Sequence, residues 1–171
     1  MGKLGDALVE KLLQASAIHK QVAMEEAIRQ LLGARPLASV SGLPTRRGRA
    51  DGGIDGIIDI QWQQNQDWVA YHAALNIKVR KSPFSREQLG GFLLDMDREK
   101  ISVGIIITAR GLAPDALSEM ARKNSDGKVK LVAIRLADIL AGNVDLPGIL
   151  ISGGTLATIL TNNLNKLLIY D

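Results

Sequence analysis

An almost wholly apolar run, Ile101–Ala109, constrains the fold more than any other feature of the chain. A strand that borders water on one face alternates apolar and polar residues, whereas this run is apolar at nearly every position. Such a strand is expected in the middle of a sheet that is covered on both faces. A second run, Val129–Ile134, predicts a further strand of the same sheet.

Helices are predicted before and between these strands. The spacing of apolar residues, together with helix-starting Ser and Pro residues, predicts helices over residues 3–32 with a break near Ser16–Lys20, from Ser85 to about Arg98, from Pro114 through Ala121, and over Ala137–Ala141. Strands and helices in this order are typical of a mixed sheet flanked by helices. We therefore expect an α/β fold, more fully an α+β mixed sheet with helices on its faces.

Two more strands are predicted to form a hairpin ahead of the apolar run. Ile54–Gln61 and Trp68–Lys81 are strand-like and are separated by the polar segment Gln63–Asp67, which has no apolar residue to bury. The two strands should therefore pair in the antiparallel sense, and each should present alternate residues to one face of the sheet.

The length of 171 residues suffices for one ordinary core and is short for two. We expect a single domain over residues 1–171. Residues 148–171 form a C-terminal extension that is rich in Leu, Ile, Thr and Asn, and they are expected to add a helix after Gly153 and Gly154. The apolar side of this extension could pack on the core or contact another subunit.

Composition narrows the classes of protein. The net charge is +3 and the sequence pI is about 9.3, a mild basic excess that suits a nucleic-acid partner without requiring one. Cysteine is absent, which excludes disulfides and thiolate metal sites. The N-terminus has no signal-peptide pattern and no apolar run reaches membrane-spanning length. We expect a soluble protein of the cytoplasm or nucleoid.

A candidate site lies on the hairpin. Asp55 is surrounded by Gly52, Gly53 and Gly56, which are expected to give the turn freedom and room for a close-lying ligand. On the second strand, alternation puts Asn76, Lys78 and Arg80 on one face. Each segment alone also fits a solvated hairpin, but together they bring a carboxylate and an ammonium group to one end of the sheet.

These segments resemble the Mrr-like branch of the PD-(D/E)xK nuclease superfamily, which occurs in restriction endonucleases and in nuclease domains fused to DNA methyltransferases. The residues that carry the resemblance are Met24–Gly33, Gly52–Ile58, Asn76–Lys78, Gly104–Thr108 and Val132–Gly142. The resemblance covers residues 22–147 and implies a restriction-endonuclease-like core there. It also implies an opening helix whose glutamate, here Glu25, points into the site.

By this resemblance, Asp55 would bind the metal, Asn76 would occupy a position that is usually Glu or Gln, and Lys78 would be the catalytic lysine. Asn76 would then add an uncharged carbonyl oxygen to the metal site. A second register, Lys78-Val79-Arg80, would put cations at both positions and leave one carboxylate for the metal. We favour the first register because it keeps a lysine and needs a single amide exchange. Reserve carboxylates that could complete the metal site are Glu25, Asp59 and Glu87, whereas His19 and His72 are isolated in the sequence.

The implied function is an Mg²⁺- or Mn²⁺-dependent endonuclease of restriction, homing or repair type that acts on duplex DNA. A homodimer or higher oligomer is expected because one site cuts one strand, and a methyltransferase or another defence or repair protein could accompany it. Two basic groups would hold the DNA backbone without reading its sequence: Arg46, Arg47 and Arg49 before the hairpin, and Arg80 and Lys81 after it. The alternative is a nuclease fold that has lost catalysis and binds DNA or a partner subunit.

Overall fold

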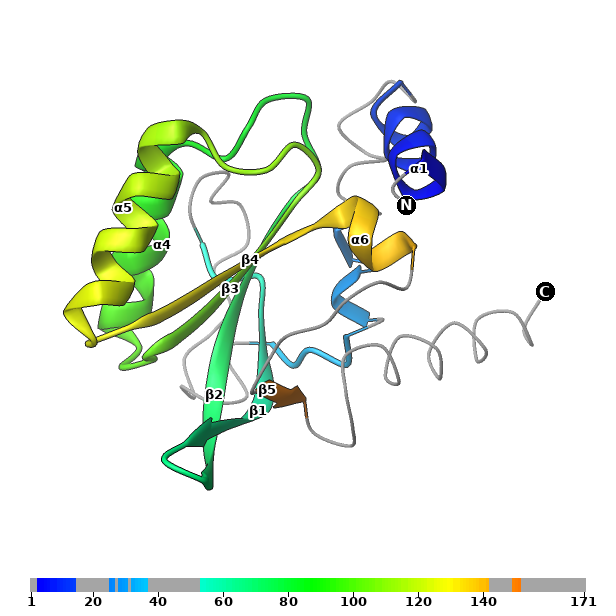
Figure 1. Ribbon diagram of the computed structural model, residues 1–171. Coiled ribbons are helices and arrows are strands. Elements are labelled where there is room, and N and C mark those ends of the chain that lie inside the picture. The colour runs from blue at the N-terminus through cyan, green and yellow to red at the C-terminus, as the bar shows by residue number, and fades with distance from the viewer. Residues whose placement is uncertain are drawn as a thin grey trace.

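The computed structural model describes residues 3–14, 25–26, 28–30, 32–36, 53–141 and 149–151, and the description below concerns these residues. Their strands form one sheet in the order β4-β3-β2-β1-β5, with helices on both faces (Figure 1). The elements in chain order are α1 (Lys3–Gln14), β1 (Gly56–Gln64), β2 (Asp67–Lys78), α4 (Arg86–Arg98), β3 (Val103–Thr108), α5 (Pro114–Asp126), β4 (Lys130–Arg135), α6 (Leu136–Leu140) and β5 (Ile149–Ile151).

The sheet is mixed, as the sequence predicts. β1 and β2 pair in the antiparallel sense from Gly56 opposite Leu75 to Gln64 opposite Asp67. Asn65 and Gln66, in the turn between them, have φ values of 48° and 72°. These values lie in the left-handed region, which suits the right-handed twist of strands joined by a two-residue turn. β2, β3 and β4 then run parallel to one another, since α4 and α5 carry the chain back between them.

Each face of the sheet carries its own hydrophobic core. Alternate residues of the strands, among them Leu75, Ile77 and Ile105, pack with residues of α1, α6 and the helical residues 28–30. The residues between them, among them Ala74 and Ile106, pack under α4 beside Phe92. The apolar run predicted for a doubly covered strand is therefore β3, whose six residues are all buried. Figure 1 shows α4 and α5 side by side on one side of the sheet and α1 near α6 on the other.

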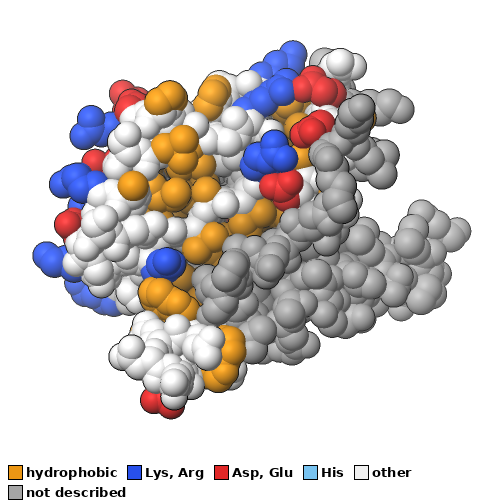
Figure 2. All heavy atoms as spheres, in the orientation of Figure 1, with side chains coloured by type: hydrophobic (Ala, Val, Ile, Leu, Met, Phe, Trp, Pro, Cys, Tyr) orange, Lys and Arg blue, Asp and Glu red, His pale blue; other side chains and the backbone are white. Residues whose placement is uncertain are grey.

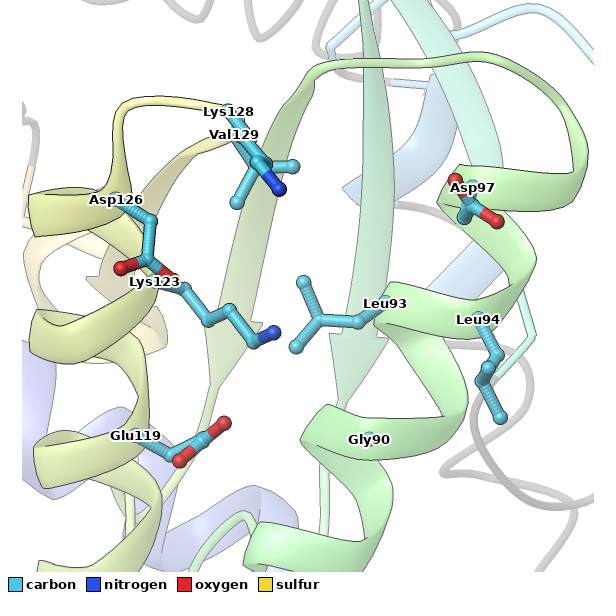
Figure 3. A pocket seen from close by; sticks show the side chains of 9 residues that line it. All are labelled: Gly90, Leu93, Leu94, Asp97, Glu119, Lys123, Asp126, Lys128 and Val129. Carbon is cyan, nitrogen blue, oxygen red and sulfur yellow. The ribbon is translucent and has the colours of Figure 1, made fainter.

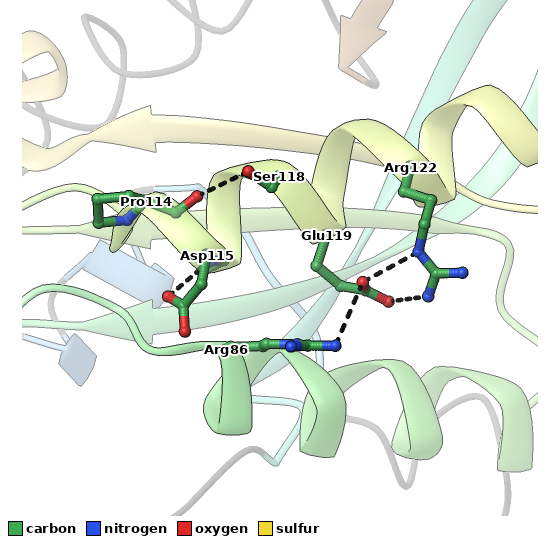
Figure 4. Close-up of polar contacts among 7 residues, drawn as sticks. Arg86, Pro114, Asp115, Ser118, Glu119 and Arg122 are labelled. Atoms are coloured by element: carbon green, nitrogen blue, oxygen red, sulfur yellow. Dashed lines mark hydrogen bonds and ion pairs between the residues drawn. The ribbon is translucent and has the colours of Figure 1, made fainter.

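Local sequence explains how α4 and α5 begin. The Ser85 hydroxyl accepts a hydrogen bond from the Gln88 N–H, and the Gln88 side chain accepts one from the Ser85 N–H, which is a capping box. Pro114 stands in the first turn of α5, where its missing N–H costs nothing. The two helices are joined at the surface through Glu119 of α5, whose carboxylate lies between Arg86 of α4 and Arg122 of α5 (Figure 4).

Two segments differ from the sequence-based expectation. Residues 149–151, at the start of the C-terminal extension, form β5, a short edge strand antiparallel to β1 at Ile60–Trp62 that the sequence analysis did not predict. The sequence Ile-Leu-Ile suits a strand because branched apolar side chains pack well on a pleated surface. The predicted helix after Gly154 lies outside the described residues. α5 also continues beyond Ala121 to Asp126, where Gly127 at φ 73° ends it. None of the described helices is both long and apolar enough to cross a membrane.

Candidate functional site

The candidate site lies where β1 stops and β2 continues alone on that side. The last β1–β2 pair is Gly56 with Leu75, and the next N–H groups of β2 donate to side chains. The Ile77 N–H donates to Asp55 Oδ2 at 2.7 Å, and the Val79 N–H donates to Glu25 Oε1 at 3.3 Å. Two carboxylates thus replace the missing strand as hydrogen-bond acceptors along the edge of β2. Sequence reasoning expected Asp55 and Glu25 at one site, and the structure places them there.

Asn76 and Lys78 lie on one face of β2, as the alternation predicts. Ala74, two residues before Asn76, packs in the core under α4, and the register puts Asp55 one position beyond the pair Gly56–Leu75. Asp55 is therefore level with Asn76, and the first register, with Asn76 and Lys78 in the site, stays a prediction. Lys78 ends β2 one alternate position further, half-buried.

Asn76 is fully buried and only partly satisfied. Its Nδ2 donates to the Gly53 carbonyl oxygen at 3.2 Å, which ties the glycine segment before β1 to β2. Among the described residues, its Oδ1 has no hydrogen-bond partner. Burial of a carbonyl oxygen without a partner is costly, and most native proteins avoid it. The side chain therefore offers an unused oxygen beside Asp55.

Burial raises the pKa of both carboxyl groups of the site above their ordinary values. The pKa of Asp55 is raised to about 6, mainly by burial and in smaller part by the nearby Glu25 charge. The Ile77 N–H and the Lys78 charge act in the opposite direction. Burial also raises the pKa of Glu25, opposed by the Val79 N–H and by Lys78 and Arg80. A cation placed among these oxygens would reverse the penalty.

Of the glycines around Asp55, Gly56 acts differently from the expectation. Gly56 has ordinary strand geometry, and a Cβ on it would lie 2.9 Å from the Ala34 Cβ and 3.3 Å from Arg29 Cγ. Its small size lets β1 pack closely against Arg29 and Ala34, and it is not needed for an unusual backbone conformation. A Cβ on Gly53 would meet nothing within 4 Å. Gly52 lies outside the described residues.

The predicted DNA-binding cations divide into two groups. Arg80 is half-buried directly after β2, where its charge helps to lower the pKa of Glu25, and Lys81 beside it is exposed. Arg46, Arg47 and Arg49 lie outside the described residues. On the face drawn in Figure 2, Lys and Arg side chains are spread along several edges rather than gathered into one patch.

Of the three reserve carboxylates, Asp59 and Glu87 do not lie beside Asp55 as Glu25 does. Asp59 lies further along β1, where its Oδ1 is 2.8 Å from an Arg35 guanidinium nitrogen and 2.6 Å from His72 Nδ1. His72, isolated in the sequence, is thus paired with Asp59 in the structure, because the hairpin register sets the two opposite each other. Glu87 is exposed in the first turn of α4. Within the described ranges, no three His, Cys, Asp or Glu residues are placed to hold one metal ion.

Sequence reasoning missed Thr108 at this site. Thr108 ends β3, and the register pairs it with Lys78 of β2. It is 3% exposed, and among the described residues it and Asn76 are the buried polar ones. The available signal was a polar residue near the end of the apolar run, but only the parallel register shows that it lies next to Lys78.

A surface groove lies away from the candidate site. A groove of about 520 Å³ runs between α4 and α5, with Leu93 and Val129 among its apolar lining residues (Figure 3). Its charged lining residues are Asp97 of α4, Glu119, Lys123 and Asp126 of α5, and Lys128 just after α5. None of the candidate site residues lines this groove, so it is a separate feature.

Comparisons with known proteins show the family and the fold. Residues 22–140 match the Mrr_cat family model, which describes a restriction endonuclease. A similar solved structure is the DNA modification-dependent restriction endonuclease AspBHI, at a TM-score of 0.50 and 14% identity, covering 99% of this chain and 40% of that one. Another is the MspJI restriction endonuclease in complex with a 27-mer oligonucleotide, at a TM-score of 0.51 and 20% identity, covering 93% of this chain and 35% of that one.

At these identities the likeness to the two structures concerns the fold, which is therefore restriction-endonuclease-like. The chain spans less than half the length of either enzyme. No curated protein matches it significantly.

Proposed function

Because the chain belongs to the Mrr-like restriction endonuclease family of the PD-(D/E)xK superfamily, we propose that it is a metal-dependent endonuclease that hydrolyses phosphodiester bonds of duplex DNA. One observation carries the proposal: Asp55, the buried Asn76 and Lys78 converge where β1 leaves β2. A carboxylate, an amide oxygen and an ammonium group at one sheet end can address a phosphate together.

The donor set fits a hard divalent cation such as Mg²⁺ or Mn²⁺. Asp55 uses Oδ2 for the Ile77 N–H and so has a second oxygen to offer, and Asn76 has its unpaired Oδ1. Glu25 is close enough to raise the pKa of Asp55, and it could complete the set. Mg²⁺ is commonly held by one or two carboxylates, with waters and substrate phosphate oxygens filling the other positions.

When bound, the cation would polarise the phosphate and lower the pKa of an attacking water. The chain's own residues would do the rest. Asp55 and Asn76 hold the site in place because each is tied to the backbone of the other segment. Lys78 stabilises the negative charge that builds up as the water oxygen bonds to phosphorus and a P–O bond breaks, and it orients that water.

Substrate and assembly follow from the same chemistry. Arg80 and Lys81 would hold the DNA backbone next to the site, joined by Arg46, Arg47 and Arg49, and such contacts give affinity without sequence information. A homodimer or higher oligomer would allow both strands to be cut. A methyltransferase or another defence or repair protein is a fitting partner. We expect the protein in the cytoplasm or nucleoid because its DNA substrate lies there.

The test is a plasmid-nicking assay with Mg²⁺ or Mn²⁺. Wild type should convert supercoiled DNA to nicked and linear forms, whereas Asp55→Ala and Lys78→Ala should lose at least about a hundredfold in rate. Glu87→Ala, which removes an exposed carboxylate away from the site, is the matched control and should cut like wild type. Equal products from all four proteins would end the proposal.

One observation favours a second candidate, a nuclease fold that binds DNA or a partner without cutting. Asn76 stands where the family resemblance expects Glu or Gln. Its side chain is one methylene shorter than either and, compared with Glu, lacks a negative charge for the metal. In that case wild type binds duplex DNA in a filter-binding assay with salt-dependent affinity but leaves plasmids intact. Affinity that does not change with salt would argue against phosphate contacts in either candidate.

A further inference from the structure

We propose that Arg110, just after β3, is a further contact for the DNA backbone, and that Glu10 of α1 holds it in the free protein until a phosphate replaces the carboxylate. The inference rests on the proposed nuclease function and adds to it a binding residue and a restraint on that residue. Neither residue belongs to the motifs of the candidate site, and α1 lies outside the residues that match the family model.

Arg110 lies at the same end of the sheet as the candidate site. β3 runs parallel to β2 and ends at Thr108, the Cα partner of Lys78. The next residue, Ala109, donates its N–H to the Lys78 carbonyl oxygen at 3.0 Å, and Arg110 follows directly. Each strand of duplex DNA carries one phosphate per about 3.4 Å of axis. A duplex with one phosphate at Lys78 therefore presents others within one strand spacing of it, where β3 ends.

The backbone around Arg110 is fixed by the segment that follows β2. The Phe84 N–H donates to the Gly111 carbonyl oxygen at 2.8 Å, and the Ala113 N–H donates to the Phe84 carbonyl oxygen at 2.9 Å. The Phe84 side chain is buried, which anchors this junction in the core. Arg110 therefore stands on a loop that is hydrogen-bonded to the loop of Lys81, one of the proposed DNA contacts.

An exposed ion pair holds the Arg110 side chain in the free protein. Its Nη1 lies 2.6 Å from Glu10 Oε1, and the two side chains are 38% and 47% exposed. Ion pairs this exposed contribute little to stability, so a phosphate can displace the carboxylate. A guanidinium binds phosphate oxygens with two parallel N–H groups, which makes phosphate the stronger partner.

The helix that carries Glu10 is firmly seated. Val9 is buried in the core on this face of the sheet. Gly5 packs so closely on the Ala137 carbonyl group of α6 that a Cβ there would collide with it. The transfer of Arg110 from Glu10 to a phosphate then needs rotation of side chains and no movement of α1.

The experiment compares wild type with Arg110→Gln, Glu10→Gln and the double variant. Affinity for a fluorescent duplex oligonucleotide is measured over a salt series in EDTA, so that cleavage plays no part, and melting temperatures are measured alongside. Arg110→Gln should bind about threefold or more weakly, with a slope of log affinity against log salt that is smaller by about 1. Glu10→Gln should bind about two- to fivefold more tightly, because no carboxylate competes for the guanidinium. The double variant should bind like Arg110→Gln.

Arg98→Gln is the matched control. Arg98 is also an exposed arginine paired with carboxylates, those of Asp95 and Glu99. It ends α4, which carries the chain from the end of β2 back to the start of β3, so it lies at the opposite end of the sheet from the candidate site. Its replacement removes the same charge and should leave the salt slope unchanged.

Unchanged binding in Arg110→Gln, an equal change in Arg98→Gln, or no gain in Glu10→Gln would overturn the inference. A double variant that binds more tightly than Arg110→Gln would also overturn it, since Glu10 would then act on DNA directly. Lower melting temperatures in both single variants with unchanged DNA binding would mean that the pair only fastens α1. If wild type binds DNA and nicks plasmids, these results leave the nuclease proposal standing. If wild type does neither, the nuclease proposal itself fails.

Discussion

At the scale of single residues, the site depends on carboxyl and amide groups that are buried although burial lowers the stability of the free protein. Asp55 and Glu25 take the place of a strand along β2, and Asn76 is buried with an unpaired oxygen. Each of these choices costs stability in the free protein and creates a place for a cation. Functional sites are where such costs are expected to occur.

The pH dependence of stability should report the burial of Asp55. Its folded-state pKa of about 6 is above the ordinary value of 3.8, so its contribution to stability is present below the ordinary value and is lost as pH rises through about 6. With EDTA present, wild type should therefore lose up to about 3 kcal/mol of unfolding free energy relative to Asp55→Asn between about pH 3.5 and pH 7.

Urea unfolding at a series of pH values measures this difference. Glu87→Gln, a change at an exposed carboxylate, is the control and should run parallel to wild type. An Asp55→Asn curve that also runs parallel to wild type would mean that the Asp55 carboxylate is not penalised by burial.

The amide at position 76 should limit metal affinity. Asn76→Glu adds a carboxylate beside Asp55, so calorimetric titration should show tighter Mg²⁺ binding than wild type, by about tenfold or more. Asn76→Leu, which keeps the branching at Cγ but removes the oxygen, should bind Mg²⁺ more weakly. Identical titrations of the three proteins would place the metal away from position 76.

At this scale the sequence predicts part of the site. Asp55 and Lys78 could be brought together in advance because they lie on two strands joined by a short polar turn, and alternation assigns their faces. Thr108 and the Asp59–His72 pair could not, because each depends on a strand register that no local pattern specifies.

At the scale of elements, the hairpin and the two crossovers were predictable, since alternation, a capping box and a first-turn proline are local signals. β5 was not, because a three-residue edge strand is defined by the strand beside it rather than by its own sequence. The packing of β1 against the helical residues around Glu25 was also not predicted. It depends on Gly56, whose small size matters only because Ala34 and Arg29 lie against it.

Gly56→Ala should therefore perturb both stability and the site. An added methyl group 2.9 Å from the Ala34 Cβ forces the segment after the Glu25 helix away from β1, at a cost of about 1–3 kcal/mol of unfolding free energy. Gly53→Ala is the matched control, since its methyl group would meet nothing, and its change should stay within about 0.5 kcal/mol. Denaturant unfolding of the two variants checks the contrast. Equal losses would mean that Gly56 is needed for backbone conformation rather than for packing.

At the scale of the whole molecule, the net charge of +3 is small, so DNA affinity must come from where the cations lie. Replacing Arg80 and Lys81 together with alanine should lower the slope of log affinity against log salt by about 1–2 units. Replacing Lys123 and Lys128, at the groove between α4 and α5, removes the same charge and should leave the slope unchanged. Filter binding over a salt series measures both. Equal slope changes would show that net charge alone sets the affinity.

The central claim is that Asp55, Asn76 and Lys78 act on one phosphate with one cation between the strands. The most direct test is the anomalous scattering of Mn²⁺ in crystals of the protein with a duplex oligonucleotide. The account predicts one ion about 2.1 Å from oxygens of Asp55 and Asn76, with the Lys78 ammonium facing the same phosphate. An ion held elsewhere, or Asp55 and Lys78 on opposite faces of the sheet, would contradict it.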